Sequence, residues 1–356
     1  MKFKTYKIKD LINEISMGPF GSNIKVECFV DSGIPVLNGS NLTGFALNDN
    51  SFRYVTPEKA DSLGKANAYR GDIVITHRGT LGQIVFIPKN SKHSRYVISQ
   101  SQFRVKCNEK ILPEYLVYYF HTNAGQHKLL SNASQVGVPA LARASTTFQT
   151  LEIDIPDVTE QRKIVDLLET IREKIELNNA INNNLEQQAD ALYQTFFSPK
   201  SGTQGKIVTL DEYCSIFTGK KNANASVNGG KYKFFTCAPE ALQIDSYIFD
   251  GNAIIVSGNG AYTGRTRFYS GKFDLYQRTY ACTLLDNVNP DFIFPLYWFV
   301  KLELSKKIMG GTRGSAIPYI VMNDLAKFEF IYNEEMFANY TPLFKSLTEA
   351  IQANEF

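Results

Sequence analysis

Apolar and small residues recur at alternating steps of four and three along the segment from Ile164 to Phe196. This spacing places them on one stripe of an α-helix and is typical of coiled coils. Asp157, with Glu160 three residues later, predicts the helix start, and Ser198-Pro199 predicts its end. The pattern therefore predicts a helix over residues 157–198 that needs a partner along its stripe.

The stripe of this helix is called the seam below. Its positions are Ile164, Leu168, Ile171, Ile175, Asn178, Asn182, Leu185, Ala189, Leu192 and Phe196. The two asparagines either lie where the seam loosens into solvent or fix the register of pairing, as buried asparagines do in coiled coils.

A second, shorter copy of the seam lies near the C-terminus. The residues Tyr340, Phe344, Leu347, Ile351 and Asn354 repeat the spacing of the first five seam positions at a constant offset of 176, as between Phe344 and Leu168. We expect a short helix over 333–356, interrupted by Pro342 unless Thr341-Pro342 is itself a helix start. The two helices are expected to pack antiparallel and to set the domains at opposite ends. Because the second helix is short, the far half of the first is expected to lack a partner within the chain.

The regions outside the helices also repeat. Three landmarks of the first half return in the second: Gly71–Ile75 as Gly251–Ile255, Ile111–Tyr115 as Val288–Phe292, and Val138-Pro139 as Ile317-Pro318. Their offsets differ by only three residues, from 177 to 180. A repeat this long indicates two similar domains in tandem rather than a solenoid.

Within each repeat, short apolar runs between Gly and Asn turns predict strands, and one longer run predicts a helix. The first repeat is expected to hold strands 73–76, 83–87 and 101–105 and helix 114–127; the second, strands 254–257, 266–269 and 280–284 and helix 292–307. The expected fold class is mixed α/β, with two similar α/β domains separated by long coiled-coil helices in pseudo-twofold symmetry. The expected boundaries are 1–156 and 199–332 for the domains and 157–198 and 333–356 for the helices.

Composition fits a globular chain that resides in the cytoplasm. The 356 residues are 44% hydrophobic and 21% charged, and the five cysteines are scattered without metal-ligand spacing. The most apolar stretch, 292–300, is far short of a membrane span of ~20 residues, so no membrane association is expected. The net charge is +3, and the segment 159–197 holds seven acids and four bases, which leaves +6 for the rest. This is modest for a protein that holds DNA alone.

No catalytic or cofactor constellation stands out. The glycine-rich loops 78–82 and 258–264 run into strand-like residues rather than a helix, so we predict hairpin turns instead of nucleotide sites. Asn289-Pro290-Asp291-Phe292 departs at its third residue from the Asn-Pro-Pro-aromatic motif of amino-group methyltransferases. The four histidines lack metal-ligand spacing, and no metal site is expected.

The loops do contain side chains suited to DNA. Arg can grip guanine and Asn or Gln adenine, whereas Lys and Ser suit phosphates. Polar loop residues are mostly plain solvated residues, so any single one of these is more often that than a contact with DNA. The candidates are Ser22, Asn23, Lys25, Asn38, Asn41, Arg78, Thr80, Gln100, Gln102, Ser134, Gln135 and Arg143 in the first repeat, and Lys220, Lys221, Asn222, Asn259, Tyr262, Arg265, Gln277, Arg278, Thr312 and Arg313 in the second.

Three motifs stand out along the chain: Gly18-Pro19-Phe20-Gly21-Ser22 followed by Gly33–Val36, Ile155-Pro156 leading to Glu160–Val165, and Lys174–Asn179. With these motifs the sequence resembles the specificity subunit of type I restriction–modification enzymes over essentially the whole chain. The second half lacks the Gly-Pro-Phe-Gly-Ser signature and the Glu-Gln pair.

The resemblance implies two target recognition domains, each reading one half of a bipartite site in double-stranded DNA, with the helices setting the spacer and docking modification subunits. It implies a chain that is not an enzyme and holds no cofactor. Methylation with S-adenosylmethionine would belong to the modification subunits, and ATP- and Mg-dependent restriction to a restriction subunit. The alternatives are a non-catalytic protein-interaction scaffold and, less compatible with the missing cofactor loop, a stand-alone methyltransferase. Salt-sensitive DNA binding would separate the first reading from the scaffold.

Overall fold

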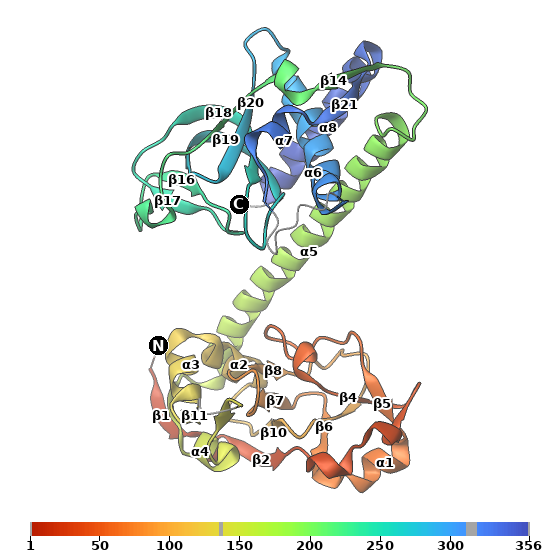
Figure 1. Ribbon diagram of the computed structural model, residues 1–356. Coiled ribbons are helices and arrows are strands. Elements are labelled where there is room, and N and C mark those ends of the chain that lie inside the picture. The colour runs from red at the N-terminus through yellow and green to blue at the C-terminus, as the bar shows by residue number, and fades with distance from the viewer. Residues whose placement is uncertain (1, 135–137, 311–318, 355–356) are drawn as a thin grey trace. The chain divides into compact units, whose positions relative to one another are not determined.

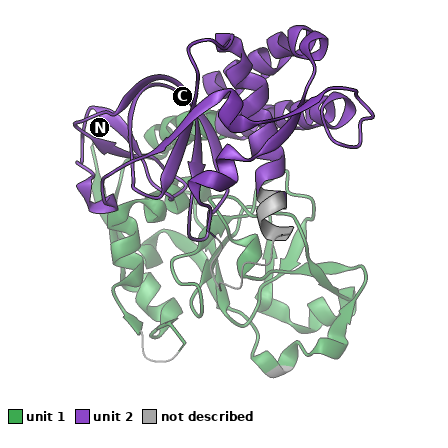
Figure 2. Ribbon diagram, turned by 45° about the horizontal axis from the view of Figure 1, so that its top comes forward, with its two compact units in different colours: residues 1–173 green, residues 174–356 purple. Residues whose placement is uncertain are grey.

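The chain forms two compact units, residues 1–173 and 174–356 (Figure 2). The computed structural model describes residues 2–134, 138–310 and 319–354 (Figure 1). Both units combine strands with helices, which confirms the predicted mixed α/β class. The division falls within one helix, α5, which runs from Val158 to Phe196.

Residues 1–173 contain two main sheets. The first is antiparallel and has the order β2 (Ile12–Met17), β10 (Gln102–Cys107), β7 (Ile73–Thr76) and β8 (Ile84–Phe86). The second has the order β3 (Phe29–Val30), β5 (Arg53–Val55), β4 (Ile34–Val36), β9 (Arg95–Val97) and β6 (Asn67–Tyr69). The smaller elements are β1 (Lys4–Lys7) paired with β13 (Glu152–Ile155), β11 (Ala133–Ser134) paired with β12 (Ala140–Leu141), and helices α1 (Pro57–Ser62) and α4 (Ala144–Thr150).

Helix α5 joins the core of this unit at its first turns. Asp157 Oδ1 accepts a hydrogen bond from Glu160 N at 3.0 Å, so the predicted cap is confirmed. The buried Gln161 amide accepts from Leu112 N at 2.9 Å and donates to the Lys110 and Pro156 carbonyls at 3.0 and 2.9 Å. One side chain thus satisfies three backbone groups and fixes the start of α5 to the segment that leads into the earlier helix α2 (Pro113–His121).

The helix predicted over 114–127 is two helices, α2 (Pro113–His121) and α3 (Asn123–Leu130). Thr122 between them has an extended backbone with ψ 157°, and its Oγ1 accepts from Gly125 N at 3.1 Å. A threonine that caps a new helix ends the preceding one, because its own backbone leaves the helical region. The prediction of one continuous helix was therefore wrong.

Residues 174–356 repeat the antiparallel sheet within a larger one. Its order is β15 (Cys214–Thr218), β20 (Thr279–Leu284), β18 (Phe249–Ser257), β19 (Thr266–Leu275), β16 (Tyr232–Phe235) and β17 (Leu242–Ile244). The first four strands have the connectivity of β2-β10-β7-β8, as the duplication predicts. The other elements are β14 (Lys206–Thr209) paired with β21 (Glu329–Tyr332), and helices α6 (Ile293–Gly310), α7 (Met322–Ala326) and α8 (Glu334–Asn354).

Helix α8 packs antiparallel against the far half of α5. Tyr340 stacks on Phe196 with ring centroids 4.2 Å apart, while Asn354 at the other end lies beside Asn178 and Asn182. The far half of α5 therefore has an internal partner, contrary to our expectation. The continuous helix also passes through Pro342. An internal proline removes a backbone hydrogen bond, and the buried residues around it, such as Phe344, hold the helix together.

The asparagines of the seam form a hydrogen-bonded cluster. Asn178 Nδ2 donates to the Asn354 carbonyl at 3.2 Å, and Asn354 Nδ2 donates to Asn182 Oδ1 at 2.8 Å. A slip of α8 by one turn would break both bonds, so the geometry favours the register-fixing reading over the solvated one.

The other seam positions divide into three groups. Ile164 and Leu168 pack on the core of residues 1–173. Leu185, Ala189, Leu192 and Phe196 pack in the core of residues 174–356 with Tyr340, Phe344, Leu347 and Ile351. Between them, Ile171 and Ile175 are 49% and 55% exposed.

Trp298 on α6 ties that helix to α8. Its indole Nε1 donates to Thr348 Oγ1 at 2.9 Å, and both side chains are buried. Phe197, Phe299 and Phe344 surround the same contact region with ring centroids 4.9 to 6.0 Å apart. Aromatic packing of this kind contributes beyond its buried area, so it makes α8 part of the core rather than an appended spacer.

Candidate nucleic-acid interface

A hairpin loop joins two antiparallel strands at the same place in each unit. In the first unit it joins β7 to β8, and in the second it joins β18 to β19. Both glycine-rich loops are therefore hairpin turns, as predicted, and neither opens a helix that could hold a phosphate.

Each turn is braced by a segment between two helices of its unit, after α3 in the first unit and after α6 in the second. Leu141 N donates to the His77 carbonyl at 2.8 Å, and Arg78 pairs with Ala140 in an isolated β-bridge. In the second unit Ile320 N donates to the Gly258 carbonyl at 2.8 Å, and Asn259 pairs with Tyr319 in an isolated β-bridge. By this bracing Arg78 corresponds to Asn259, so the two turns share a backbone design with different side chains.

The turns present polar groups outward. Arg78 and Thr80 are exposed. In the second unit the Arg265 guanidinium lies 4.5 Å from the centre of the Tyr262 ring. This stacking restricts the arginine rotamers, which lowers the entropy that a contact with a base or phosphate would otherwise cost.

The loop containing Gly-Pro-Phe-Gly-Ser is pressed against the chain between β9 and β10. Gly18 N donates to the Gln102 carbonyl at 2.8 Å. A Cβ on Gly18 would lie 1.9 Å from the Ser99 carbonyl oxygen, and one on Gly21 would lie 2.1 Å from Gln100 Oε1. Gly18 therefore requires glycine because backbone atoms block a side chain there, whereas the atom that blocks Gly21 belongs to the flexible Gln100 side chain. The approach places Gly21 beside the Gln100 side chain, which is exposed.

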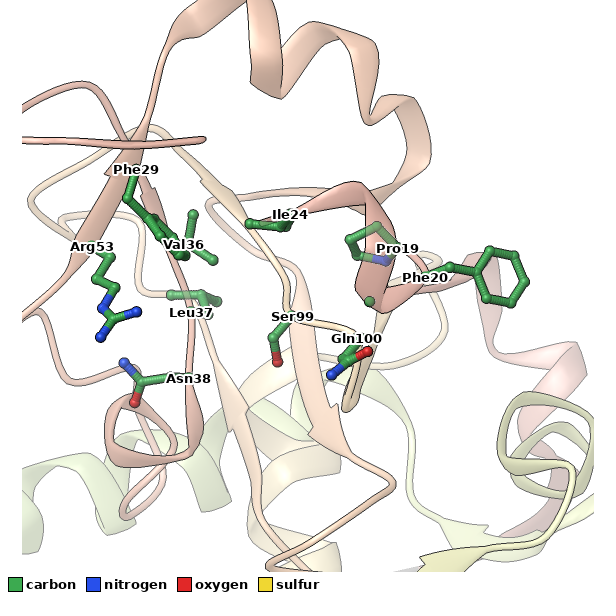
Figure 3. Close-up of a pocket in the computed structure, with 11 residues that line it drawn as sticks. Pro19, Phe20, Ile24, Phe29, Val36, Leu37, Asn38, Arg53, Ser99 and Gln100 are labelled. Carbon is green, nitrogen blue, oxygen red and sulfur yellow. The ribbon is translucent and has the colours of Figure 1, made fainter. Parts of the chain in front are cut away.

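A pocket of about 410 Å³ opens beside this loop (Figure 3). Ile24, Phe29 and Val36 contribute an apolar wall. Arg53 and Asn38 face each other on one side, and Gln100 lies on the other. Its volume falls in the range of roughly 300–1,000 Å³ typical of small-molecule sites.

Three predicted DNA contacts have internal roles instead. Asn41 is fully buried and its Nδ2 donates to the carbonyls of Asn48 and Asn50. Gln102 is also buried, and its Oε1 accepts from Ser99 N at 2.9 Å. Lys221 Nζ lies 2.6 Å from the fully buried Asp274 carboxylate. These groups satisfy buried partners and are removed from the candidate interface.

The other candidates are placed as follows. Those exposed on loops or element ends are Asn23, Lys25, Asn38, Ser134, Arg143, Lys220, Asn222, Gln277 and Arg278. Ser22 lies in the 3-10 turn Gly21–Asn23, and Arg143 has a left-handed backbone with φ 47°. Gln135, Thr312 and Arg313, together with the repeat landmark Ile317-Pro318, lie outside the described residues.

The described part of the chain holds no group of three potential metal ligands, and no described helix has the length and apolarity of a membrane span. Burial raises the pKa of Cys107 and of Cys214 to about 12. Because the thiolate is the nucleophile, these two thiols are unreactive at neutral pH.

Two residues at the candidate interface were not selected from the sequence. Phe20 lies within the Gly-Pro-Phe-Gly-Ser motif, and its side chain is 85% exposed. An aromatic between two glycines in a loop was a signal that could have identified it. Arg53 stacks on Phe29 with its Cζ 5.1 Å from the ring centre. Its sequence context carries no comparable signal.

Comparison with known proteins gives three findings. A family model for the type I restriction modification DNA specificity domain matches residues 2–187 and 204–332. The specificity subunit of the type I restriction enzyme EcoDI of Escherichia coli is 42% identical over 120 residues, which are 34% of this chain and 26% of that protein. The HindI specificity subunit of Haemophilus influenzae is 28% identical over 193 residues, which are 52% of this chain and 41% of that protein. The matched segments thus span less than half of either relative.

A solved structure shares the fold. The S subunit of a type I restriction–modification system from M. genitalium superimposes with a TM-score of 0.66 at 14% identity, covering 99% of this chain and 91% of that one.

Proposed function

The chain belongs to the family of type I restriction modification DNA specificity domains, and we propose on that basis that it is the sequence-reading, non-catalytic subunit of such a complex in the cytoplasm. Each unit reads one half of a bipartite site in double-stranded DNA. Modification subunits supply methylation with S-adenosylmethionine, and a restriction subunit supplies the ATP- and Mg-dependent reactions.

The duplicated hairpin turn is the observation that carries this proposal. The same backbone brace holds the turn in both units, yet the side chains presented differ: Arg78 and Thr80 in one, Tyr262 and Arg265 in the other. Two copies of one scaffold with different polar groups suit two different short base sequences. Arginine in the major groove grips guanine with two hydrogen bonds, which gives direct readout.

Charge and exposed apolar residues support the involvement of partners. The net charge of +3 supplies few phosphate contacts for a protein that would otherwise bind DNA alone. Helix α5 also exposes Leu167, Ile171, Ile175, Leu177 and Ile181. Apolar side chains gathered on one helix are typical of protein interfaces, so this part of α5 is the proposed docking place for modification subunits.

We expect Arg78→Ala and Arg265→Ala each to change the recognised sequence in one half-site only. Loss of a bidentate contact should reduce discrimination at one or two base pairs by about 1–3 kcal/mol. Mapping of methylated adenines in cells that carry each variant would show the altered half-site. The control is Lys128→Ala, because Lys128 Nζ donates to the Glu152 carbonyl outside the candidate set. If both arginine variants kept the original sequence, the assignment of these turns to base reading would be wrong.

The proposed ruler role of α5 has its own test. Inserting four residues between Ile171 and Ile175, where the side chains are exposed, should lengthen the helix by ~6 Å. At ~3.4 Å per base pair, the non-specific spacer between the half-sites should grow by about two base pairs. Replacing residues 171–174 by four alanines keeps the length and should leave the spacer unchanged. An insertion variant that methylates the original spacing would contradict the ruler.

A further inference from the structure

Phe20 stands out as an apolar side chain held in solvent beside an apolar pocket. It is 85% exposed, and Figure 3 shows its ring directed away from the pocket that its own backbone helps to line. Leaving a phenylalanine in water forfeits roughly 1.5–3 kcal/mol of burial. The pocket lies next to it, yet the ring does not turn in to fill it.

The loop geometry explains why the ring stays outside. Gly18 lies against the Ser99 carbonyl with no space for a Cβ, and Asn23 N donates back to the Phe20 carbonyl at 2.8 Å. The backbone on both sides of Phe20 is therefore fixed. A preorganised protruding ring loses little conformational freedom when it inserts into a partner.

The pocket itself offers an apolar wall and a set of hydrogen-bond donors. Asn38 Oδ1 already accepts from Ser40 N at 2.8 Å and from Ser40 Oγ at 2.5 Å, so its amide NH₂ is the group left to face the pocket. Arg53 forms no ion pair with any residue that the structure describes, and its guanidinium stacks on Phe29. This side of the pocket can give hydrogen bonds but cannot accept them.

We propose that this pocket holds one base unstacked from the DNA, and that Phe20 is the wedge that takes its place in the stack. Apolar wedges between base steps and pockets that combine stacking with hydrogen bonds to a base edge are the two halves of such a device. The donors of Arg53 and Asn38 favour a base edge that offers hydrogen-bond acceptors, such as O6 and N7 of guanine or O4 of thymine. The N6 amino group of adenine cannot accept from them, so adenine is disfavoured. The proposal rests on the proposed function.

The test uses the full chain in complex with its modification subunits and the DNA sequence obtained from its methylation pattern. In each of a series of duplexes, one guanine or thymine of the recognised sequence is kept while its partner is changed to a mismatch. Unstacking is easier for an unpaired base, so one mismatch should tighten binding at least about tenfold, whereas mismatches elsewhere weaken it. Affinity is measured by fluorescence anisotropy.

Variants then assign the effect to this pocket. Phe20→Ala and Arg53→Ala should each abolish the tightening at that position, while Tyr69→Ala, an exposed aromatic on β6, should retain it. If every mismatch weakens binding, or if tightening survives both variants, the pocket proposal is overturned and DNA reading stands. If the complex shows no sequence preference at all, the proposed function fails and the pocket proposal falls with it.

Discussion

Replacing Lys221 with methionine is expected to lower the free energy of unfolding of residues 174–356 by roughly 2–4 kcal/mol. The Asp274 carboxylate is fully buried and would keep only the hydrogen bonds from Ser246 Oγ and its own neighbour Leu275 N, each at 2.8 Å. A buried carboxylate that loses its cation is strongly destabilising. The loss is smaller here than for a fully enclosed pair because the Lys221 side chain is 35% exposed.

The matched control is Lys220→Met, one residue earlier and exposed. This variant should change stability by no more than about 0.5 kcal/mol but weaken DNA binding to all sequences and reduce the salt slope by about one. Urea unfolding followed by circular dichroism and DNA titrations at several salt concentrations measure the two effects. A Lys221→Met variant that is as stable as the wild type but binds DNA more weakly would show that Lys221 contacts DNA, as predicted from the sequence.

Arg104→Met is expected to destabilise residues 1–173 by about 3–5 kcal/mol. The Arg104 side chain is nearly enclosed and lies 2.7 Å from the Glu14 carboxylate and 3.3 Å from the Asp72 carboxylate. Its Nε also donates to the Lys65 carbonyl at 3.0 Å. Removing the guanidinium leaves Asp72 buried with the hydrogen bond from Tyr69 N alone. The second substitution Asp72→Asn, made in the Arg104→Met background, should recover part of the loss.

The pH dependence of this variant follows from two carboxyl groups. Burial raises the pKa of Asp72, against the Tyr69 hydrogen bond and the Arg104 charge. At Glu14 the opposing effect of burial is outweighed by Arg104, and the pKa is lowered. A raised carboxyl pKa means that the folded state binds more protons, so acidification favours it; a lowered pKa has the opposite sign. The wild type keeps the Glu14 contribution until pH falls through the lowered pKa of Glu14. The variant lacks the Arg104 charge that opposes protonation of Asp72, so it gains stability at higher pH by protonating Asp72.

The stability difference between the two proteins should therefore shrink as pH is lowered from neutral into the titration range of the carboxyl groups. Urea midpoints measured across this range for wild type, Arg104→Met and the double variant give the comparison. A difference that stays constant or widens would show that Asp72 does not carry the effect.

Features set by neighbouring residues could be predicted from the sequence. The Asp157 cap, the two hairpin turns and the start of β7 at Ile73 depend on residues a few positions apart. The duplication also predicted that the two units share one strand connectivity, because a repeated pattern of strands folds into a repeated sheet.

Features that depend on contacts between distant parts of the chain could not be predicted from the sequence. Asn41 looks like a loop residue until the chain closes around it and offers the Asn48 and Asn50 carbonyls. Lys221 finds its acid 53 residues away. Helix α8 continues through Pro342 because its aromatic residues pack in the core. Helix propensity alone would predict that the helix ends at this proline. Polar residue type therefore identifies candidates, and only packing separates a contact with DNA from an internal bond.

Trp298 is the only tryptophan in the chain, and its indole is sealed between α6 and α8 by the bond to Thr348. Tryptophan fluorescence, excited where only indole absorbs, therefore reports on residues 174–356 and on the packing of α8. Far-ultraviolet circular dichroism reports on the whole backbone. Overlaying the two melting curves distinguishes concerted from sequential unfolding of the units in the intact polypeptide, without any label or fragment.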